Sequence, residues 1–505
     1  MITSRRRFVQ SLAAASAAVP ATRLWADTAS SASTPAVTLA GKPITLSAAD
    51  VKDLRSGLRG QLLQAQDAGY EQARRLWNPM FDRHPALIVR CAGTEDVARA
   101  VTFARAHDLL TAVRGGGHSL SGQSACDRGL MIDMSRMKSI DVDAQRRLGR
   151  AQGGVLLGEL DRKMQSVGLA TTLGTATDTG IAGLTLGGGM GRLMRKHGLA
   201  CDNLESVEMV SAQGRVLRAS AKDNPDLFWG VRGGGGNFGV VTSFEYRLHP
   251  LEGKVLDGAR VYPYAQARSV FAAVAELSER APDDLMLSVA LLNYPPGTER
   301  PGRVVGVSTT FLGDPADGER LIEPLKKLGS PLIDQIAAVS YIEAQGAQGE
   351  IAPVAVPSAT RGAPMYTKTG FLHSSSTEFF DELIRRFEAL PEAIDAVALW
   401  AQIGGQVARV APQATAFWNR AAAHDLLIGG SWADRARDEA NIKDLRAVWA
   451  GVEKYTEGFY VNTEPGADDK RVRATYGDNY ARLQQLKNKY DPGNLFRLNA
   501  NIRPA

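Results

Sequence analysis

The segment from Val113 to Gly122 reads VRGGGHSLSG and places a histidine directly after three consecutive glycines. Glycine is favoured where the backbone must adopt a positive φ or approach another group closely, so this run predicts a ligand that lies against the main chain. His118 would then present its ring to that ligand. The segment predicts a binding site in which the imidazole is either a hydrogen-bonding group or a point of covalent attachment.

Two other roles for His118 find no support in the rest of the chain. A metal site needs companion ligands, and the seven histidines show neither HxH nor HExxH spacing. A nucleophilic triad of the hydrolase type would need a G-x-S-x-G elbow, which the sequence lacks. We therefore predict no metal centre and no serine nucleophile.

Two further glycine runs follow, Gly187 to Gly191 and Gly234 to Gly239. The last one satisfies G-x-G-x-x-G, but the residues after it, VVTSFEYRL, are typical of a strand and not of the helix that a dinucleotide-binding turn requires. Successive bare N–H groups nevertheless form a concavity that holds an anion. Together the three runs predict one large ligand, with phosphate or nucleotide character, that the backbone contacts at several points.

The elements around these runs indicate how they are positioned. A strand, an amphipathic helix that we expect to begin at an N-cap near Thr94, and a second strand lead into the first run. A hairpin with a turn at Gln213–Gly214 separates the second run from the third. From Leu251 to about Thr456 the glycines thin out and strands mix with amphipathic helices, which predicts a second α+β domain.

Composition and charge exclude several classes of function. The chain has 505 residues, enough for two or three domains, and past its N-terminus it has no apolar stretch that could span a membrane. Its net charge of +5 comes largely from four arginines in the first 26 residues, and the rest of the chain has 55 basic and 54 acidic residues. A near-neutral chain is not expected to bind nucleic acid. The three cysteines lack CxxC spacing and are interpreted as buried apolar residues.

The N-terminal residues have the features of an export signal. They read MITSRRRFVQSLAAASAAVPATRLWA, with a basic start, an Ala-rich middle too short to span a bilayer and small residues near the end. Ser4 to Val9 resembles the twin-arginine signal, which exports proteins already folded. We expect a signal peptide at 1–26, a periplasmic or secreted protein, and a linker with short helices at 27–82; a simple amphipathic start helix is the alternative.

Four segments in this order resemble the FAD-linked oxidases of the berberine-bridge-enzyme type, within the vanillyl-alcohol-oxidase superfamily. They are VRGGGHSLSGQSACDRGLMIDMSRMKSIDVD, LGTATDTGIAGLTLGGGMGRLMRKHGLACDNLESVEMV, DLFWGVRGGGGNFGVVTSFEYRLHP and YGDNYARLQQLKNKYDPGNLFRLNANIRP. The resemblance implies an α+β fold with a PCMH-type FAD-binding domain of two α/β subdomains at 83–250. It also implies a substrate-binding domain at 251–455, whose antiparallel sheet is covered by helices, and a C-terminal segment at 456–505 that completes the FAD domain.

The resemblance also implies which residues bind FAD. Residues 114–119 would wrap the pyrophosphate, and His118 would carry the flavin covalently. Ala176 stands where many relatives have a cysteine that forms a second bond, so a single covalent link is expected. The implied cofactor-binding residues are Arg114, Gly115, Gly116, Gly117, His118, Ser119, Gly122, Thr175, Asp178, Thr179, Gly180, Gly183, Gly236, Gly239, Val241, Asn462 and Asn499.

The residue that accepts the substrate proton departs from the family pattern. Met190 and the stretch 406–408 occupy the two places where relatives carry a base, which leaves Tyr460 of the Y-x-N stretch as the candidate catalytic residue. A phenol needs a lowered pKa to act at neutral pH, so packing of Tyr460 on the flavin without acid–base work is the alternative.

The resemblance implies an oxidase that takes a hydride from an alcohol, amine or phenolic small molecule and reduces O2 to hydrogen peroxide. Thr179, a short side chain before Gly180, would leave room for O2. Two alternatives stay open: a dehydrogenase that uses another acceptor, and a flavin-holding protein with little turnover. Neither nucleic acid nor membrane is expected as a partner.

Overall fold

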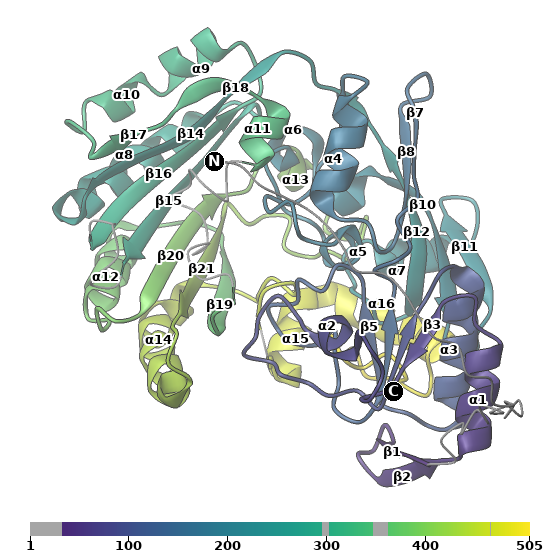
Figure 1. Cartoon of the computed structure of the whole chain (residues 1–505). Helices are drawn as coiled ribbons and strands as arrows, with labels where there is room; N and C mark the ends of the chain where they lie inside the picture. The colour runs from purple at the N-terminus through teal and green to yellow at the C-terminus, as the bar shows by residue number, and fades with distance from the viewer. Residues whose placement is uncertain (1–32, 295–301, 347–361, 465) are drawn as a thin grey trace, which may run out of the picture.

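The computed structural model describes residues 33–294, 302–346, 362–464 and 466–505. The expected signal peptide at 1–26 lies outside the described residues. In the described part of the chain, no helix is both long and apolar enough to cross a membrane. The helices and strands form three main sheets with their covering helices (Figure 1).

The first sheet carries the histidine-containing glycine run at the end of a strand. Its strands are β3 (Gln61–Leu63), β4 (Leu87–Arg90), β6 (Leu130–Asp133) and β5 (Thr111–Arg114), in that spatial order. Strands β4 and β5 both run parallel to β6, and the run begins where β5 ends. The accompanying elements are α1 (Ala48–Ser56), α2 (Tyr70–Arg74), α3 (Thr94–Ala106) and the hairpin of β1 (Thr34–Val37) and β2 (Pro43–Leu46).

The second sheet has five antiparallel strands. They are β11 (Val216–Ser220), β10 (Leu204–Ser211), β12 (Gly239–Arg247), β8 (Leu148–Gln152) and β7 (Ile140–Asp143), in that order. Helices α4 (Leu157–Gln165), α5 (Ile181–Leu186), α6 (Met194–His197) and α7 (Pro225–Val231), and the short pair β9 (Leu169–Ala170) and β13 (His249–Pro250), accompany it. The expected turn at Gly214 joins β10 to β11, and the residues after the third glycine run form β12 as predicted.

The third sheet has eight strands. In Figure 1, a gap separates the ribbons of this sheet from those of the other two sheets. Its strands are β17 (Ile333–Asp334), β14 (Lys254–Pro263), β16 (Arg303–Phe311), β15 (Leu285–Asn293), β20 (Asp395–Gln402), β21 (His424–Ser431) and β19 (Met365–Leu372), with β18 (Ala337–Ser340) also on β14. Helices α8 (Ala267–Arg280), α12 (Thr377–Glu388) and α14 (Asp438–Val452) pack their apolar sides on one face. Shorter helices are α9 (Pro315–Leu321), α10 (Glu323–Lys326), α11 (Tyr341–Gly346) and α13 (Gln406–Arg409).

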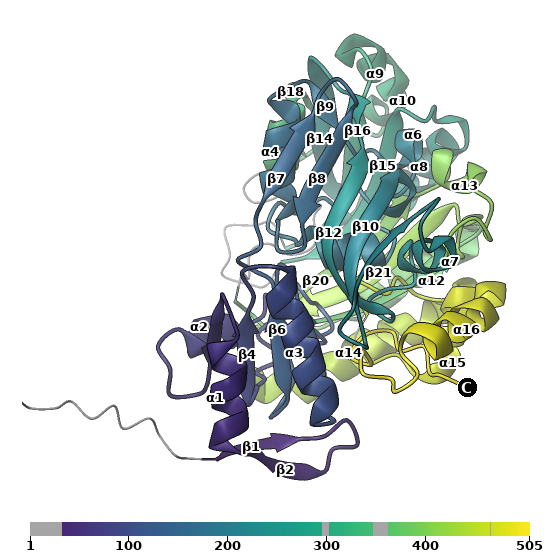
Figure 2. The ribbon, with the colours of Figure 1, turned by 90° about the vertical axis from the view of Figure 1, so that its right-hand side faces the viewer.

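The chain then returns to the first two sheets. Helices α15 (Asp469–Tyr476) and α16 (Tyr480–Tyr490) share one hydrophobic core with the second sheet and α7 (Figure 2). The residues after α16 reach the core of the first sheet through Leu495 and Phe496. The C-terminal segment therefore joins the two sheets that carry the glycine runs.

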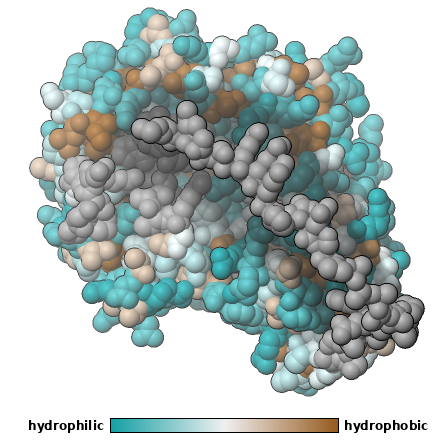
Figure 3. All heavy atoms as spheres, in the orientation of Figure 1, coloured by the Kyte–Doolittle hydropathy of each residue, from teal (hydrophilic) through white to brown (hydrophobic). Residues whose placement is uncertain are grey.

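The structure confirms the α+β fold, with the antiparallel sheet and covering helices expected after residue 251. Details differ from the sequence-based expectations. Residues 34–46, assigned to a linker, form the β1–β2 hairpin, and Gly93 rather than Thr94 precedes α3, because the Thr94 hydroxyl donates to Glu208 (2.8 Å). The three cysteines are buried and free, as interpreted. On the face shown in Figure 3, hydrophobic residues lie in small groups among hydrophilic ones.

Candidate functional site

A cavity of about 430 Å³ lies where the glycine runs, the first two sheets and the C-terminal segment meet. It brings together fifteen of the seventeen cofactor-binding residues expected from the sequence, and also Tyr460 and Ala176. These fifteen are Gly115, Gly116, Gly117, His118, Ser119, Thr175, Asp178, Thr179, Gly180, Gly183, Gly236, Gly239, Val241, Asn462 and Asn499. Arg114 and Gly122 do not line it.

Glycines of the first run are required for backbone packing. A Cβ atom on Gly116 would lie 2.5 Å from Cα of Gly180, so these two loops can approach only without side chains. Gly117 has φ +75°, a conformation that strongly favours glycine. Arg114 turns away from the cavity and pairs with the buried Asp133 (3.2 Å). Its role in the structure is to hold the base of the loop.

His118 stands in the cavity wall between an indole and a carboxylate. Its ring stacks on Trp77 with 4.5 Å between the ring centroids, and Nε2 lies 3.5 Å from Oδ1 of Asp178. The backbone N–H of Trp77 donates to the Gly117 carbonyl oxygen (2.8 Å), which ties this residue to the same loop. The ring is therefore fixed in place and faces the cavity.

The second and third loops leave space where side chains would otherwise project. Gly183 and Gly236 line the cavity, and an added Cβ at either position would have no atom within 4 Å. The buried Oδ1 atom of Asn499, also in the wall, has no hydrogen-bond partner among the described residues. Bare backbone and an unpaired polar atom fit an extended polar ligand such as FAD.

The C-terminal segment is fastened to the third glycine run by a buried lysine. Nζ of Lys487 donates to Asp491 (2.7 Å) and to the carbonyl oxygens of Asn237 and Phe496 (both 2.9 Å). The Asn237 side chain in turn donates to the Ala500 carbonyl oxygen (3.1 Å). Since Phe496 and Ala500 line the cavity, these contacts complete its wall.

Tyr460 lines the cavity with a phenolic oxygen that accepts three hydrogen bonds. The donors are the backbone N–H groups of Gly189 (3.2 Å) and Met190 (3.3 Å) and the side-chain amide of Asn462 (2.9 Å). These bonds favour the phenolate, but burial outweighs them and raises the pKa of Tyr460 to about 12. A base at neutral pH needs the opposite shift.

Asp425 is a candidate that the sequence analysis missed. It lies on β21 opposite Phe371 of β19, on the sheet face away from α8, α12 and α14, and Phe371 packs with Tyr460. Its Oδ1 is buried and has no partner among the described residues, and burial raises the pKa of Asp425 to about 7. The available signal was a lone acid in the apolar strand HDLLIGGS.

Comparisons with known proteins agree with this geometry. Residues 85–220 match the model of an FAD binding domain, and residues 459–503 match the berberine and berberine-like model. The FAD-linked oxidoreductase YgaK of Bacillus subtilis is 31% identical over 89% of this chain and 98% of its own length. The chain belongs to the berberine-bridge-type FAD-linked oxidoreductases.

This FAD-linked oxidoreductase also resembles enzymes whose names state a substrate. (R)-6-hydroxynicotine oxidase of Paenarthrobacter nicotinovorans is 30% identical over 88% of this chain and 97% of that protein. The crystal structure of 6-hydroxy-D-nicotine oxidase from Arthrobacter nicotinovorans superposes with a TM-score of 0.80 at 29% identity, covering 89% of this chain and 98% of that one. Chitooligosaccharide oxidase shares the fold, with a TM-score of 0.79 at 22% identity over 90% of this chain and all of that one. The resemblance stated from the sequence is thus confirmed.

Proposed function

We propose that this enzyme is an oxidase with a single flavin link through His118. In this proposal it takes a hydride from an alcohol, amine or phenolic small molecule and reduces O2 to hydrogen peroxide. The observation that carries the proposal is the fixed imidazole of His118 in the wall of a glycine-lined cavity, beside Asp178. The names of the hydroxynicotine oxidases support oxidase chemistry.

Bound FAD would supply the acceptor for the hydride and the place where O2 is reduced. The glycine loops and the C-terminal wall would hold the cofactor, and Asp178 would orient the His118 ring. None of the described residues that line the cavity is a cysteine, which supports the proposal of one covalent link.

We assign the proton-accepting role to Asp425 rather than Tyr460. The Asp425 carboxyl is buried on the sheet face that carries Phe371, and burial raises its pKa to about 7, so that it would be half ionised at pH 7 and mostly ionised at pH 8. A substrate between the cavity and this face would transfer its hydroxyl or amine proton to Oδ1, the atom without a partner among the described residues. Tyr460 would keep the loop at Gly189 and Met190 in position.

Denaturation tests the covalent link. Acid-precipitated protein should stay yellow and fluorescent under ultraviolet light, and its mass should exceed that of the chain by one FAD. His118→Ala should abolish the mass shift, whereas His373→Ala, at an exposed histidine paired with Glu457, should retain it. A colourless precipitate from the parent protein would contradict the proposed attachment.

Reoxidation separates an oxidase from a dehydrogenase. The short side chain of Thr179 lines the cavity, which supports access of O2. Dithionite-reduced enzyme mixed with air in a stopped-flow instrument should recover its flavin absorbance within seconds. A reduced flavin that persists for minutes would favour the dehydrogenase. A peroxide-release screen with alcohols, amines, phenolics and oligosaccharides would then identify the substrate class.

We also propose that the enzyme is exported by the twin-arginine route to the periplasm or the medium. This rests on the sequence of residues 1–26, which lie outside the described structure. Substitution of Arg5 and Arg6 by Lys should leave the protein in the cytoplasm, which cell fractionation measures.

A further inference from the structure

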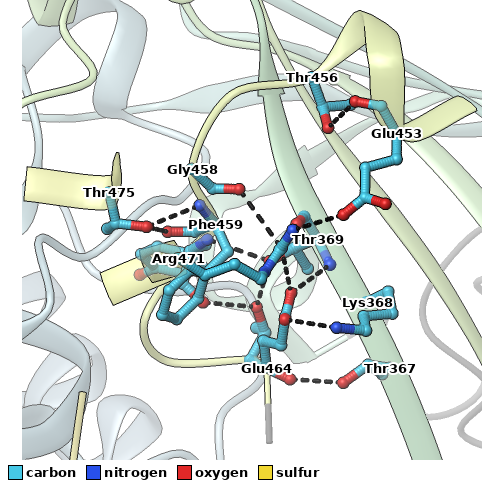
Figure 4. Close-up of polar contacts among 12 residues, drawn as sticks. Thr367, Lys368, Thr369, Glu453, Thr456, Gly458, Phe459, Glu464, Arg471 and Thr475 are labelled. Carbon is cyan, nitrogen blue, oxygen red and sulfur yellow. Dashed lines mark hydrogen bonds and ion pairs between the residues drawn. The ribbon is translucent and has the colours of Figure 1, made fainter. Parts of the chain in front are cut away.

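The segment Phe459–Glu464 forms one wall of the flavin cavity and spans two parts of the fold. Four consecutive residues, Tyr460 to Thr463, line the cavity. On one side of the segment lies β19 of the eight-stranded sheet, and on the other lies α15 of the C-terminal segment (Figure 4). Its placement therefore sets how the sheet stands relative to the cavity.

Glu464 is the residue through which most of these contacts pass. Its side chain is fully buried, and Oε1 accepts a hydrogen bond from Nζ of Lys368 (2.7 Å). Oε2 accepts from the Arg471 guanidinium (2.8 Å) and from the backbone N–H of Thr369 (3.2 Å). A single carboxylate thus joins the wall segment to β19 and α15 (Figure 4).

Backbone contacts repeat the same connection. The N–H of Tyr460 donates to the Thr369 hydroxyl (3.0 Å), and the Thr367 hydroxyl donates to the Thr463 carbonyl oxygen. Arg471 also donates to the carbonyl oxygens of Thr369 (3.2 Å) and Gly458 (3.4 Å). These bonds and those of Glu464 therefore connect the wall segment to the same two elements.

We propose that Glu464 is a positioning residue. It fixes the Tyr460–Thr463 wall against the eight-stranded sheet, so that the distance between the cavity and Asp425 stays suitable for proton transfer from the substrate. This inference rests on the proposed function for its catalytic consequence, but not for the positioning itself. Replacing this buried carboxylate by a neutral group removes the ion pair of Lys368 and one of the two ion pairs of Arg471, so the wall should loosen locally.

Hydrogen exchange of the holoenzyme tests the positioning directly. In Glu464→Gln, peptides that cover 459–464 and 365–372 should exchange about tenfold faster, while peptides of the first two sheets should not change. The matched control is Glu453→Gln, because Glu453 pairs with the same Arg471 (2.9 Å) from an exposed position and no contact joins it to β19 in Figure 4. That variant should exchange like the parent.

Kinetics then separate positioning from mere stabilisation. With the compound that releases most peroxide in the screen, the rate constant of flavin reduction in Glu464→Gln should fall by about 10–100-fold with little change in substrate Kd. Glu464→Asp, which keeps the charge on a shorter side chain, should be intermediate. The double variant Lys368→Met/Glu464→Leu replaces the ion pair by an apolar pair. Compared with Glu464→Gln, it should regain thermal stability without regaining the rate of flavin reduction.

Three results would overturn the proposal: unchanged exchange in Glu464→Gln, faster exchange throughout the chain, or full recovery of the rate in the double variant. If no compound in the screen reduces the flavin, the proposed function fails while the exchange measurement still decides the role of Glu464.

Discussion

At the scale of single residues, burial has different consequences for Asp425 and Tyr460. Both groups are shielded from water, and burial favours the neutral form of each. The result is useful for a carboxyl, whose pKa rises to about 7, and unfavourable for a phenol, whose pKa rises to about 12. The same physical cause therefore favours the proposed role of Asp425 as a base near neutral pH and keeps Tyr460 protonated.

Asp425→Asn should lower the rate of flavin reduction at pH 8 by about 10²–10⁴-fold, because an amide cannot accept the substrate proton. In the parent, the rate should rise with pH and level off above the pKa of Asp425, near 7. The variant should lose this rise. Asp395→Asn is the control, since Asp395 is a buried acid at the far end of the neighbouring strand. A variant that keeps both the parent rate and its pH dependence would exclude Asp425 as the base.

Asp425 should also make stability depend on pH. Its pKa is raised in the native state, so between about pH 4 and pH 7 the native protein retains a proton that the unfolded chain has lost, and stability falls as pH rises. Asp425→Asn removes this loss. Relative to the parent, the free energy of unfolding of the variant should gain about 4 kcal/mol between pH 4 and pH 8. Denaturant titrations at several pH values measure it.

Tyr460→Phe should affect stability more than catalysis. The substitution leaves three N–H donors without their acceptor, which costs about 1–3 kcal/mol. Since the phenol is neutral at working pH, the rate of flavin reduction should fall by less than about tenfold. A loss as large as that of Asp425→Asn, with an unchanged pH profile in the latter, would restore Tyr460 as the base.

At the scale of elements, short loops and helices leave open space for the ligand. Helix α5 begins after Gly180 and carries Gly183, which lines the cavity. Glycine is unfavourable within a helix, and among the described residues no atom would lie within 4 Å of a Cβ added at this position. The residue is therefore explained by the ligand and not by the fold.

Gly183→Leu should accordingly separate cofactor binding from folding. The side chain would project into the cavity, so the purified protein should contain little or no FAD, measured as the ratio of absorbance at 450 nm to that at 280 nm. Circular dichroism should remain unchanged, since leucine favours a helix more than glycine by about 0.8–1 kcal/mol. Gly493→Leu, at an equally open position outside the cavity, should keep its FAD.

At the scale of the whole molecule, the flavin site depends on residues that lie far apart in the chain. Lys487 is fully buried, and burial lowers the pKa of its ammonium group, while Asp491 and two carbonyl oxygens keep it paired. Through these bonds the C-terminal segment closes the cavity over loops that lie some 250 residues earlier in the chain.

Lys487→Met should disturb both stability and cofactor binding. It leaves the Asp491 carboxylate buried without its cation, which costs about 3–5 kcal/mol. Thermal unfolding should shift down by several degrees, and FAD content should fall with it. Lys489→Met, two residues on and exposed beside Asp226, should match the parent in both measurements. Equal melting temperatures for the two variants would contradict this role of the buried lysine.

Much of the site could be predicted from the sequence, because it depends on local spacing. The strand that leads into the run ending at His118 and the strand after Gly239 depend on a few neighbouring residues, and both form as expected. The family pattern then identified fifteen residues that meet in one cavity.

The remaining assignments depend on contacts between distant residues, and the sequence could not supply them. Whether Arg114 faces the ligand was decided by Asp133 on the neighbouring strand. The high pKa of Tyr460 and the importance of Asp425 follow from burial, which arises only when β19, β21 and the loop at Gly189 pack together. The sequence by itself determined which glycine-rich segments line the cavity. Only the tertiary structure decided the pKa values of Asp425 and Tyr460, because a pKa depends on all the atoms around a group and not only on its neighbours in the chain.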